Sequence, residues 1–211
     1  MSKTQVQNEE SEDGPPSESF SEASRWRLRR SLALVGLMGA GKTAIGKRLS
    51  QATEAPFLDA DSEIEAAARM TIPEIFARHG EPAFRDGERR VIARLVETPA
   101  PFVLATGGGA FMNPDTRKLL KERCMVLWLK ADVDVLVRRL AKKSDRPLLE
   151  TGDRRATLAA LVEKRHPVYA EAHLTLDGGE ATQEEALAQT LALLSDEGVI
   201  ERREPSGRGA R

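Results

Sequence analysis

The chain has 211 residues, of which 40% are hydrophobic and 31% are charged, and its formal net charge is −1. This length and composition predict one soluble globular domain, and the balanced charge gives no whole-chain signal for binding nucleic acid or a membrane surface. The single cysteine, Cys124, excludes an intramolecular disulfide and fits a reducing cytoplasm, while the lack of a long apolar run predicts neither a signal peptide nor a transmembrane helix.

Both ends of the chain are poor in the branched aliphatic residues that a core requires. Residues 1–28 are largely acidic and rich in serine, and residues 199–211 carry a basic excess. We therefore predict two disordered tails around a folded domain at 29–198. Solvated termini are the simpler interpretation of the tails, and interaction segments are the alternative.

Between the tails, short aliphatic runs alternate with amphipathic segments. Five runs have the length and composition of buried strands, at 32–36, 56–61, 102–108, 125–130 and 173–177. Helical periodicity follows them, at 42–53, 62–69, 72–97, 113–123, 132–143, 156–166 and 181–196. The alternation predicts an α/β fold of parallel βαβ units, with helices on both faces of one sheet and ligands at the carboxyl ends of the strands.

The segment after the first predicted strand, GLMGAGKT at 36–43, fits the phosphate-binding pattern G-x-x-x-x-G-K-[ST]. Its glycines let successive backbone N–H groups surround an anion, and the N-terminus of the next helix adds partial positive charge. Lys42 would reach the outer phosphates, and the Thr43 hydroxyl would bind Mg²⁺. A glycine-rich turn without a ligand is the alternative. The motif predicts a nucleotide but leaves the acceptor open.

Candidate acceptor residues lie further along the chain. Asp59 and Asp61 alternate at the end of the second predicted strand, so one could serve a metal and the other a substrate, unless they only cap the next helix. The triplet Gly107, Gly108 and Gly109 directly follows a predicted strand, where a backbone without side chains can come against a ligand.

Three arginines are candidates for binding anions. Arg146 lies in a charged Arg-Pro segment at about 141–153, which is typical of a mobile lid. Arg165 lies on a helix predicted to end near Pro167, where its guanidinium could take a carboxylate bidentately. Taken singly, Arg165 would be a solvated helix charge, and Arg85 with Glu88 would be a surface ion pair.

In order and approximate spacing, these segments resemble the shikimate kinase family. The matching motifs are GLMGAGKT, FLDAD, FRDGE, GGG, DRPLL and RHPVY, and the resemblance covers about residues 32–194. It implies a three-layer α/β/α P-loop kinase fold with a five-stranded parallel sheet and a mobile lid. It also implies a monomer that transfers the γ-phosphate of ATP to the 3-hydroxyl of shikimate, with Mg²⁺, in aromatic amino-acid biosynthesis.

The resemblance assigns roles residue by residue. The catalytic residues would be Asp61, which would orient or deprotonate the attacking hydroxyl, together with Lys42 and the lid arginine Arg146. The metal would lie near Thr43 and Asp59. The nucleotide contacts would be Gly39, Ala40, Gly41, Lys42, Thr43, Ala44, Arg139 and Arg146. The shikimate contacts would be Asp61, Arg85, Gly107, Gly108, Gly109 and Arg165, with the two arginines on the carboxylate.

Some positions are less specific. Phe76 and Phe84 match aromatic positions near the substrate but suit a core equally well, and Glu88 would support Arg85. No counterpart of an adenine-facing proline occurs near the segment LDGGEATQ at 176–183.

Two other functions fit parts of the pattern. One is a kinase for another polyol acid such as gluconate, against which FLDAD, FRDGE and RHPVY argue together. The other is a nucleotide-binding regulatory module that signals through its tails, which would predict a guanine-reading N-K-x-D segment or a lost acceptor site, and the sequence has neither.

Overall fold

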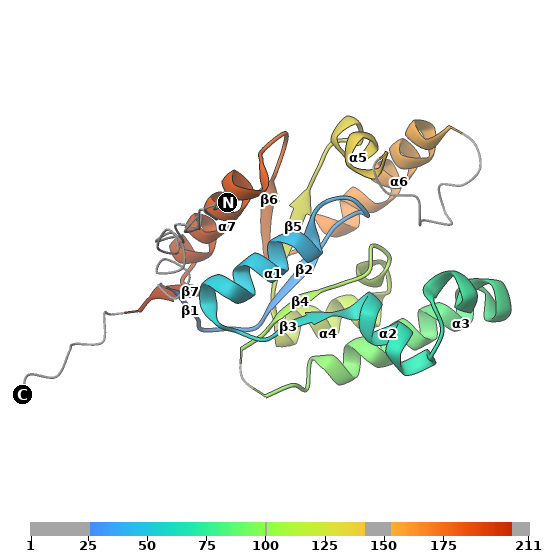
Figure 1. Cartoon of the computed structure of the whole chain (residues 1–211), viewed down its shortest axis with the longest axis horizontal. Helices are drawn as coiled ribbons and strands as arrows, with labels where there is room; N and C mark the ends of the chain where they lie inside the picture. Colours follow the sequence, from blue (N-terminus) through green and yellow to red (C-terminus); the bar gives the residue numbers. More distant parts are fainter. Residues whose placement is uncertain (1–25, 100, 142–152, 204–211) are drawn as a thin grey trace, which may run out of the picture.

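The computed structural model describes residues 26–99, 101–141 and 153–203, and a five-stranded sheet organises this part of the chain (Figure 1). Its strands are β2 (Leu32–Val35), β3 (Phe57–Asp59), β4 (Val103–Ala105), β5 (Met125–Lys130) and β6 (Leu174–Asp177). Their spatial order is β3-β4-β2-β5-β6, and every neighbouring pair is parallel. The predicted five-stranded parallel sheet is confirmed.

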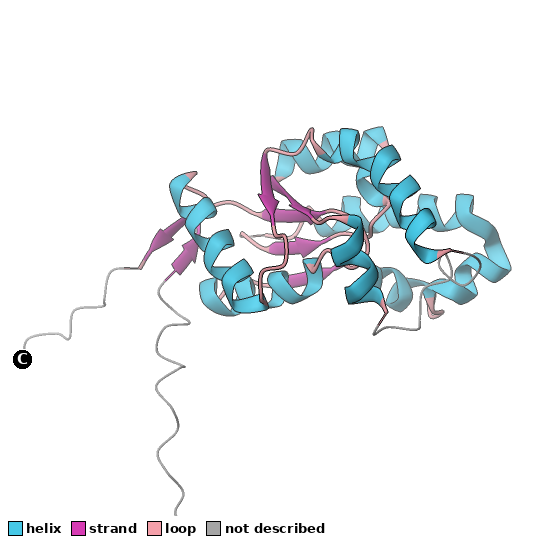
Figure 2. Ribbon diagram, turned by 90° about the horizontal axis from the view of Figure 1, so that it is seen from above, coloured by secondary structure: helices cyan, strands magenta, loops and turns pink. Residues whose placement is uncertain are grey.

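The helices lie on both faces of this sheet (Figure 2). They are α1 (Lys42–Thr53), α2 (Ala60–Ala68), α3 (Ile72–Leu95), α4 (Pro114–Arg123), α5 (Val133–Leu140), α6 (Arg154–Tyr169) and α7 (Gln183–Asp196), with a short 3₁₀ turn η2 (Ala110–Met112). Connections between parallel strands are right-handed. The chain moves from β2 outward to β3 and then back across the sheet through β4, β5 and β6, so α1 lies on one face and α3, α4 and α6 lie on the other. The last helix, α7, packs beside α1.

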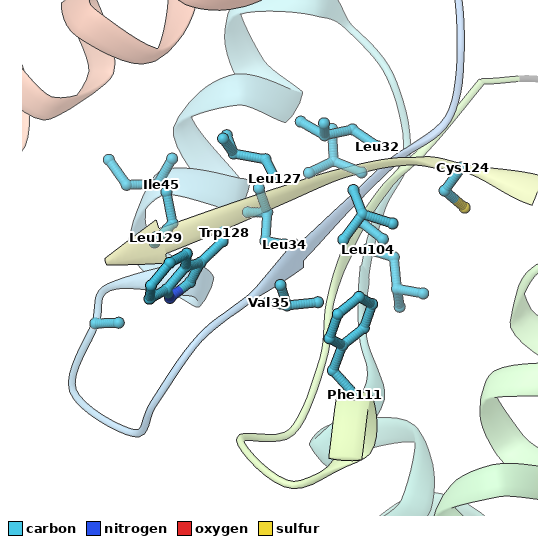
Figure 3. Close-up of a cluster of buried hydrophobic side chains, with 14 of the residues drawn as sticks. Leu32, Leu34, Val35, Ile45, Leu104, Phe111, Cys124, Leu127, Trp128 and Leu129 are labelled. Carbon is cyan, nitrogen blue, oxygen red and sulfur yellow. The ribbon is translucent and has the colours of Figure 1, made fainter. Parts of the chain in front are cut away.

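The central strand β2 anchors the core between β4 and β5. All four of its residues are fully buried, and the side chains of β4, β5 and η2 pack around them (Figure 3). Each large aliphatic side chain removed from water in this way contributes about 1.5–3 kcal/mol. The continuous apolar runs that predicted these strands are therefore explained by burial on both faces.

Helix α3 begins at a capping box but is not one continuous helix. The Thr71 hydroxyl accepts from the Glu74 N–H, and the Glu74 carboxylate accepts from the Thr71 N–H. At Gly80 the backbone leaves helical geometry, with φ 78° and ψ 170°, and Pro82 follows at the start of the second part. The single predicted helix at 72–97 is thus two helical pieces joined at a glycine, because only glycine adopts such a φ without strain.

The structure corrects the predicted boundaries of the two tails. Trp26–Leu28 forms β1 and Ile200–Arg202 forms β7, and they pair antiparallel with Leu28 opposite Ile200. Both of these aliphatic side chains are buried in the main core, and the Arg202 guanidinium carbon lies 5.3 Å from the Trp26 ring centre. Residues 1–25 and 204–211 lie outside the described part of the chain, so the rest of the tail prediction stays a prediction.

One further local prediction is confirmed and another was wrong. Helix α6 ends at Tyr169, two residues past Pro167, and Tyr169 is buried. Strand β3 ends at Asp59, so Asp61 does not alternate with it along a strand but lies in the first turn of α2. Among the described residues, no helix is long and apolar enough to cross a membrane.

Candidate active site

The phosphate-binding loop connects β2 to α1 at the carboxyl end of the sheet (Figure 1). Gly36, Gly39 and Gly41 all have positive φ, and a Cβ at Gly36 would lie 2.6 Å from the carbonyl oxygen of Leu129. The loop therefore requires glycine both for its dihedral angles and for its approach to β5. Lys42 is buried, and its Nζ donates to the carbonyl oxygens of Gly36 at 2.8 Å and Leu37 at 3.0 Å.

Thr43 and Asp59 are brought together although 16 positions separate them. The Thr43 hydroxyl donates to Asp59 Oδ2 at 2.9 Å. The other oxygen of Asp59 accepts from the backbone N–H groups of Asp61 and Ser62, at 3.1 and 3.4 Å, and so caps α2. Asp59 thus caps α2, one of the two roles that the sequence left open, and it also accepts from the Thr43 hydroxyl. Its role toward a metal stays a prediction.

This pair suits Mg²⁺ by the chemistry of its donors. Mg²⁺ prefers hard oxygen ligands, takes one or two from a protein, and completes its octahedron with water and substrate phosphates. A hydroxyl and a carboxylate beside a phosphate loop are such a set. Within the described ranges no group of three or more His, Cys, Asp or Glu residues could hold a metal.

Two cavities meet at Asp61. One, of about 820 Å³, is lined by the phosphate loop, by α5 and by the segment after β6. The other, of about 430 Å³, lies between α2, α3 and the glycine turn after β4. Asp61, Met38 and Gly108 line both, so the two cavities share a wall. A ligand in either cavity would lie against the wall that carries the Asp61 carboxylate.

The second cavity contains a partly buried ion pair. Arg85 donates through Nη1 to Glu88 Oε2 at 2.8 Å and through Nε and Nη2 to Glu81 Oε1 at 3.2 and 3.1 Å. Burial alone would lower the pKa of Arg85, but the Glu88 and Glu81 carboxylates hold it above its usual value. Taken alone, the sequence would indicate a surface ion pair between Arg85 and Glu88. In the structure the Glu88 side chain of this pair is only 4% exposed.

Glu88 is held in an unusual state for a carboxylate. Burial raises its pKa, and the charge of Arg85 offsets this effect only in part, while nearby Asp61 adds to it. Its second oxygen, Oε1, is buried without a hydrogen-bond partner among the described residues. A buried acceptor without a donor is costly in free energy.

The glycine triplet is required by the charged side chains around it. A Cβ at Gly107 would lie 2.5 Å from Glu88 Oε1 and 2.8 Å from Asp61 Oδ1, and a Cβ at Gly109 would overlap the guanidinium of Arg85. We expected these glycines to admit a ligand. The structure shows that Gly107 and Gly109 first admit the protein's own acidic and basic groups.

Arg165 enters the second cavity from α6. Its Nη1 donates to the carbonyl oxygen of Gly108 at 2.9 Å, so residues 57 positions apart meet at the shared wall. Tyr169, one helical turn further, donates its hydroxyl to the same oxygen at 2.5 Å. This tyrosine is the last residue of the motif RHPVY and was not predicted as a site residue. Its i+4 spacing from Arg165 was the available signal.

Aromatic side chains form the apolar wall of the second cavity. The rings of Phe76 and Phe84 lie 4.7 Å apart and are inclined by 38°, and both line the cavity. Phe84 is also buried in a small cluster with Ile64 and Ile75. These residues therefore pack in a core cluster and also line the cavity, and their contact with a substrate stays a prediction.

The first cavity is closed on its far side by Arg139. This residue of α5 donates to the carbonyl oxygens of Ala40 and Ala181, each at 3.5 Å, and so connects the phosphate loop to the segment after β6. Gly39, Ala40, Gly41 and Ala44 line the same cavity, and their contact with a nucleotide stays a prediction. Arg146 lies outside the described residues, as does most of the predicted lid at 141–153.

Comparisons with known proteins agree with this geometry. The sequence model of the family described as shikimate kinase matches residues 38–195. A shikimate kinase of Rhodopseudomonas palustris is 50% identical over 167 residues, which is 79% of this chain and 82% of that protein.

Solved structures point the same way. A shikimate kinase from Acinetobacter baumannii in complex with shikimate has a TM-score of 0.76 and 37% identity, covering 80% of this chain and 94% of that one. A gluconokinase from Sinorhizobium meliloti has a TM-score of 0.52 at 17% identity, covering 82% of this chain and 97% of that one, and shows the shared fold alone.

Proposed function

Because the chain belongs to the shikimate kinase family, and its activity is the ATP-dependent phosphorylation of shikimate in aromatic biosynthesis, we propose how its residues divide that reaction. In this proposal the larger cavity holds ATP and the smaller one holds shikimate. The γ-phosphoryl group passes to the 3-hydroxyl at the wall that they share. The observation that carries the proposal is the position of Asp61 on both cavities.

On the nucleotide side, we propose that the loop N–H groups and Lys42 bind the phosphates and that Thr43 and Asp59 hold Mg²⁺. When bound, Mg²⁺ would neutralise charge on the phosphate oxygens. Lys42 already lies over the loop with its Nζ between two carbonyl oxygens, so its charge is positioned before the nucleotide arrives. Such preorganisation matters because phosphoryl transfer depends mainly on positioning and charge stabilisation.

On the acceptor side, we propose that Arg85 and Arg165 bind the shikimate carboxylate. Support comes from their entry into one cavity from different helices, and from Gly109, which leaves room for the Arg85 guanidinium. The free acceptor oxygen of Glu88 would be satisfied by a ring hydroxyl. The glycine backbone would then approach the ring beside these groups.

We assign the proton transfer to Asp61. The attacking hydroxyl oxygen forms the new P–O bond, the bond to the β-phosphate oxygen breaks, and the hydroxyl proton passes to the carboxylate. Because the transition state is loose, orienting the hydroxyl contributes more than basicity does.

The remaining parts of the proposal concern the protein as a whole. Arg146 would be the lid arginine that closes over the transferring phosphate, and Arg139 would lie against the adenine. The protein would act as a cytoplasmic monomer, with disordered tails on both sides of the domain.

A conservative variant tests the acceptor site. Arg85→Lys keeps a cation beside Glu88 but loses the planar guanidinium that binds a carboxylate bidentately. We expect the KM for shikimate to rise about 10-fold or more, with the KM for ATP changing less than about twofold. Steady-state ADP release with each substrate varied in turn measures both constants.

The control for this experiment is Arg89→Lys. Arg89 lies on the same helix but pairs with Asp86 on the exposed side, and it does not line the cavity. It should leave both constants unchanged. Equal increases in the two KM values for Arg85→Lys, or an unchanged KM for shikimate, would contradict the proposed acceptor site.

A further inference from the structure

Tyr169 is the last residue of α6 and has almost no solvent exposure, with 1% of its surface accessible. Pro167 lies two positions earlier and has no N–H group, so this last turn lacks one backbone hydrogen bond. A helix interrupted in this way needs another anchor if it is to hold its position. The side chain of Tyr169 provides one.

The Tyr169 hydroxyl and the Arg165 guanidinium donate to one acceptor, the carbonyl oxygen of Gly108. A carbonyl oxygen has two lone pairs, so a neutral and a charged donor together fill its capacity. Gly108 lies at the wall that the two cavities share. The position of this carbonyl oxygen therefore sets the orientation of the Arg165 guanidinium in the acceptor cavity.

The phenol ring is held on two sides. Its centre lies 6.4 Å from the Phe111 ring and 5.9 Å from the Trp128 ring, so the ring lies between η2 and β5. Burial raises the pKa of Tyr169 to about 12, and the charge of Arg165 opposes this only in part. The hydroxyl thus stays protonated at neutral pH and remains a donor whose direction is fixed by packing.

We propose that Tyr169 is a positioning residue for the acceptor: its hydroxyl fixes the Gly108 carbonyl, and Arg165 is oriented against that carbonyl toward the substrate carboxylate. This inference rests on the proposed function, in which Arg165 binds the shikimate carboxylate. It adds that Arg165 is oriented by a neighbour that does not touch the substrate. Truncating the neighbour's hydroxyl should then weaken acceptor binding without affecting the nucleotide.

The test uses Tyr169→Phe in the full-length protein, because this variant keeps the ring between Phe111 and Trp128 and removes only the hydroxyl. We expect the KM for shikimate to rise about fivefold, in line with the loss of one neutral hydrogen bond, and the KM for ATP to stay within about twofold. The measurement is ADP release with shikimate varied at saturating ATP, and then with ATP varied at saturating shikimate.

The matched control is Thr190→Val. Thr190 is fully buried on α7, and its hydroxyl donates to the carbonyl oxygen of Ala186 at 2.6 Å. The control therefore removes another buried hydroxyl-to-carbonyl hydrogen bond at a position that lines neither cavity. It should lower the temperature of unfolding without changing either KM. If Tyr169→Phe behaves like Thr190→Val, the hydroxyl is only structural and the inference is overturned.

A double-variant cycle separates the inference from the proposed function. If Tyr169 acts through Arg165, adding Tyr169→Phe to Arg165→Lys should raise the KM for shikimate less than Tyr169→Phe does alone. Full additivity of the two effects would overturn the inference. If Arg165→Lys alone leaves the KM for shikimate unchanged, the proposed role of Arg165 fails, and the positioning role fails with it. An increase for Arg165→Lys with none for Tyr169→Phe overturns the positioning role alone.

Discussion

At the scale of single residues, the glycines after β4 are explained by the atoms that occupy the space a side chain would need. The Cβ that Gly109 lacks would coincide with the Arg85 guanidinium, and the one that Gly107 lacks would meet two carboxylates. These residues therefore allow charged groups to converge, and in the proposed function they would contribute to acceptor binding indirectly. In the sequence, the same triplet indicated only a close approach to a ligand.

This leads to a prediction for Gly109→Ala. The added methyl group must displace Arg85, so we expect the KM for shikimate to rise about 10-fold or more, with a smaller effect on the KM for ATP. Gly87→Ala is the control, because a Cβ there meets nothing within 4 Å and alanine favours a helix by about 1 kcal/mol. Kinetics and thermal unfolding of both variants provide the test, and an unchanged KM for Gly109→Ala would contradict the explanation.

At the scale of secondary-structure elements, the start of β5 depends on a histidine. His173, just before β6, accepts a hydrogen bond at Nδ1 from the backbone N–H of Val126, at 3.0 Å. The ring must be unprotonated at that nitrogen to accept. Burial lowers the pKa of His173, and the nearby positive charges of Lys121 and Arg30 lower it further.

The sign of the resulting pH dependence follows from this shift. Because the folded-state pKa lies below the unfolded value of 6.5, the unfolded chain binds more protons in the window between them. The stability that His173 contributes is therefore complete above about pH 6.5 and is lost as the pH falls through its folded-state pKa. Glu88, whose folded-state pKa is raised, acts in the opposite direction, so wild type alone does not isolate His173.

We therefore predict the pH profile of a variant. His173→Asn replaces the histidine with an uncharged acceptor. The unfolding temperature of wild type, relative to that of the variant, should therefore increase as the pH rises from about 5 to about 7. The control is His79→Asn, at an exposed position of α3, which should leave this difference constant. A difference that does not change with pH for His173→Asn would argue against the role of the hydrogen bond.

At the scale of the whole molecule, the β1–β7 sheet joins the two ends of the domain. It lies on the opposite side of the molecule from α5 and α6, beside the start of β2 (Figure 1). Leu28 and Ile200 extend the main core into this small sheet, although each strand has only three residues. The sheet should therefore stabilise the fold without taking part in the reaction.

The corresponding prediction is that Ile200→Ala lowers the free energy of unfolding by about 2–4 kcal/mol. Because Ile200 is 2% exposed and lies far from both cavities, the kcat of the folded enzyme at 25 °C should be unchanged. Glu201→Ala, which removes only exposed ion pairs with Arg27 and Arg29, should cost less than about 1 kcal/mol. Denaturant unfolding measures the energies, and equal losses for the two variants would contradict the core role of the sheet.

The parts of the fold that could be predicted are those whose signal lies in a short stretch of sequence. The five strands of the main sheet and the phosphate loop follow from short patterns, and the structure places them within a few residues of the expected bounds. Burial was predicted less well, because β3 is only partly buried and β6 alternates between partly buried and exposed residues. The β1–β7 pairing was not predictable, because three-residue strands have no readable period and their partners lie more than 170 positions apart. The extension of α6 past Pro167 likewise depends on Tyr169 meeting Gly108, a contact between distant segments.

The candidate site likewise combines features with a local sequence signal and features that depend on contacts between distant segments. The residue types of the proposed acceptor site could be named from motifs. The expected position of Asp61 at the end of a strand was wrong, because Asp61 lies in the first turn of a helix. The burial of Glu88 and its unpartnered oxygen depend on the packing of α3 against the turn after β4, which no spacing in the sequence describes. Arg146 remains a prediction from the sequence, outside the described residues.

The wall that the two cavities share also has a thermodynamic consequence. If Asp61, Met38 and Gly108 adjust when one cavity is filled, the affinity of the other ligand changes by some factor, and linkage requires the same factor in the reverse direction. The two substrates are then energetically coupled through three residues and need no distant relay. Synergy between nucleotide and acceptor would be a property of this boundary, set before any phosphate moves.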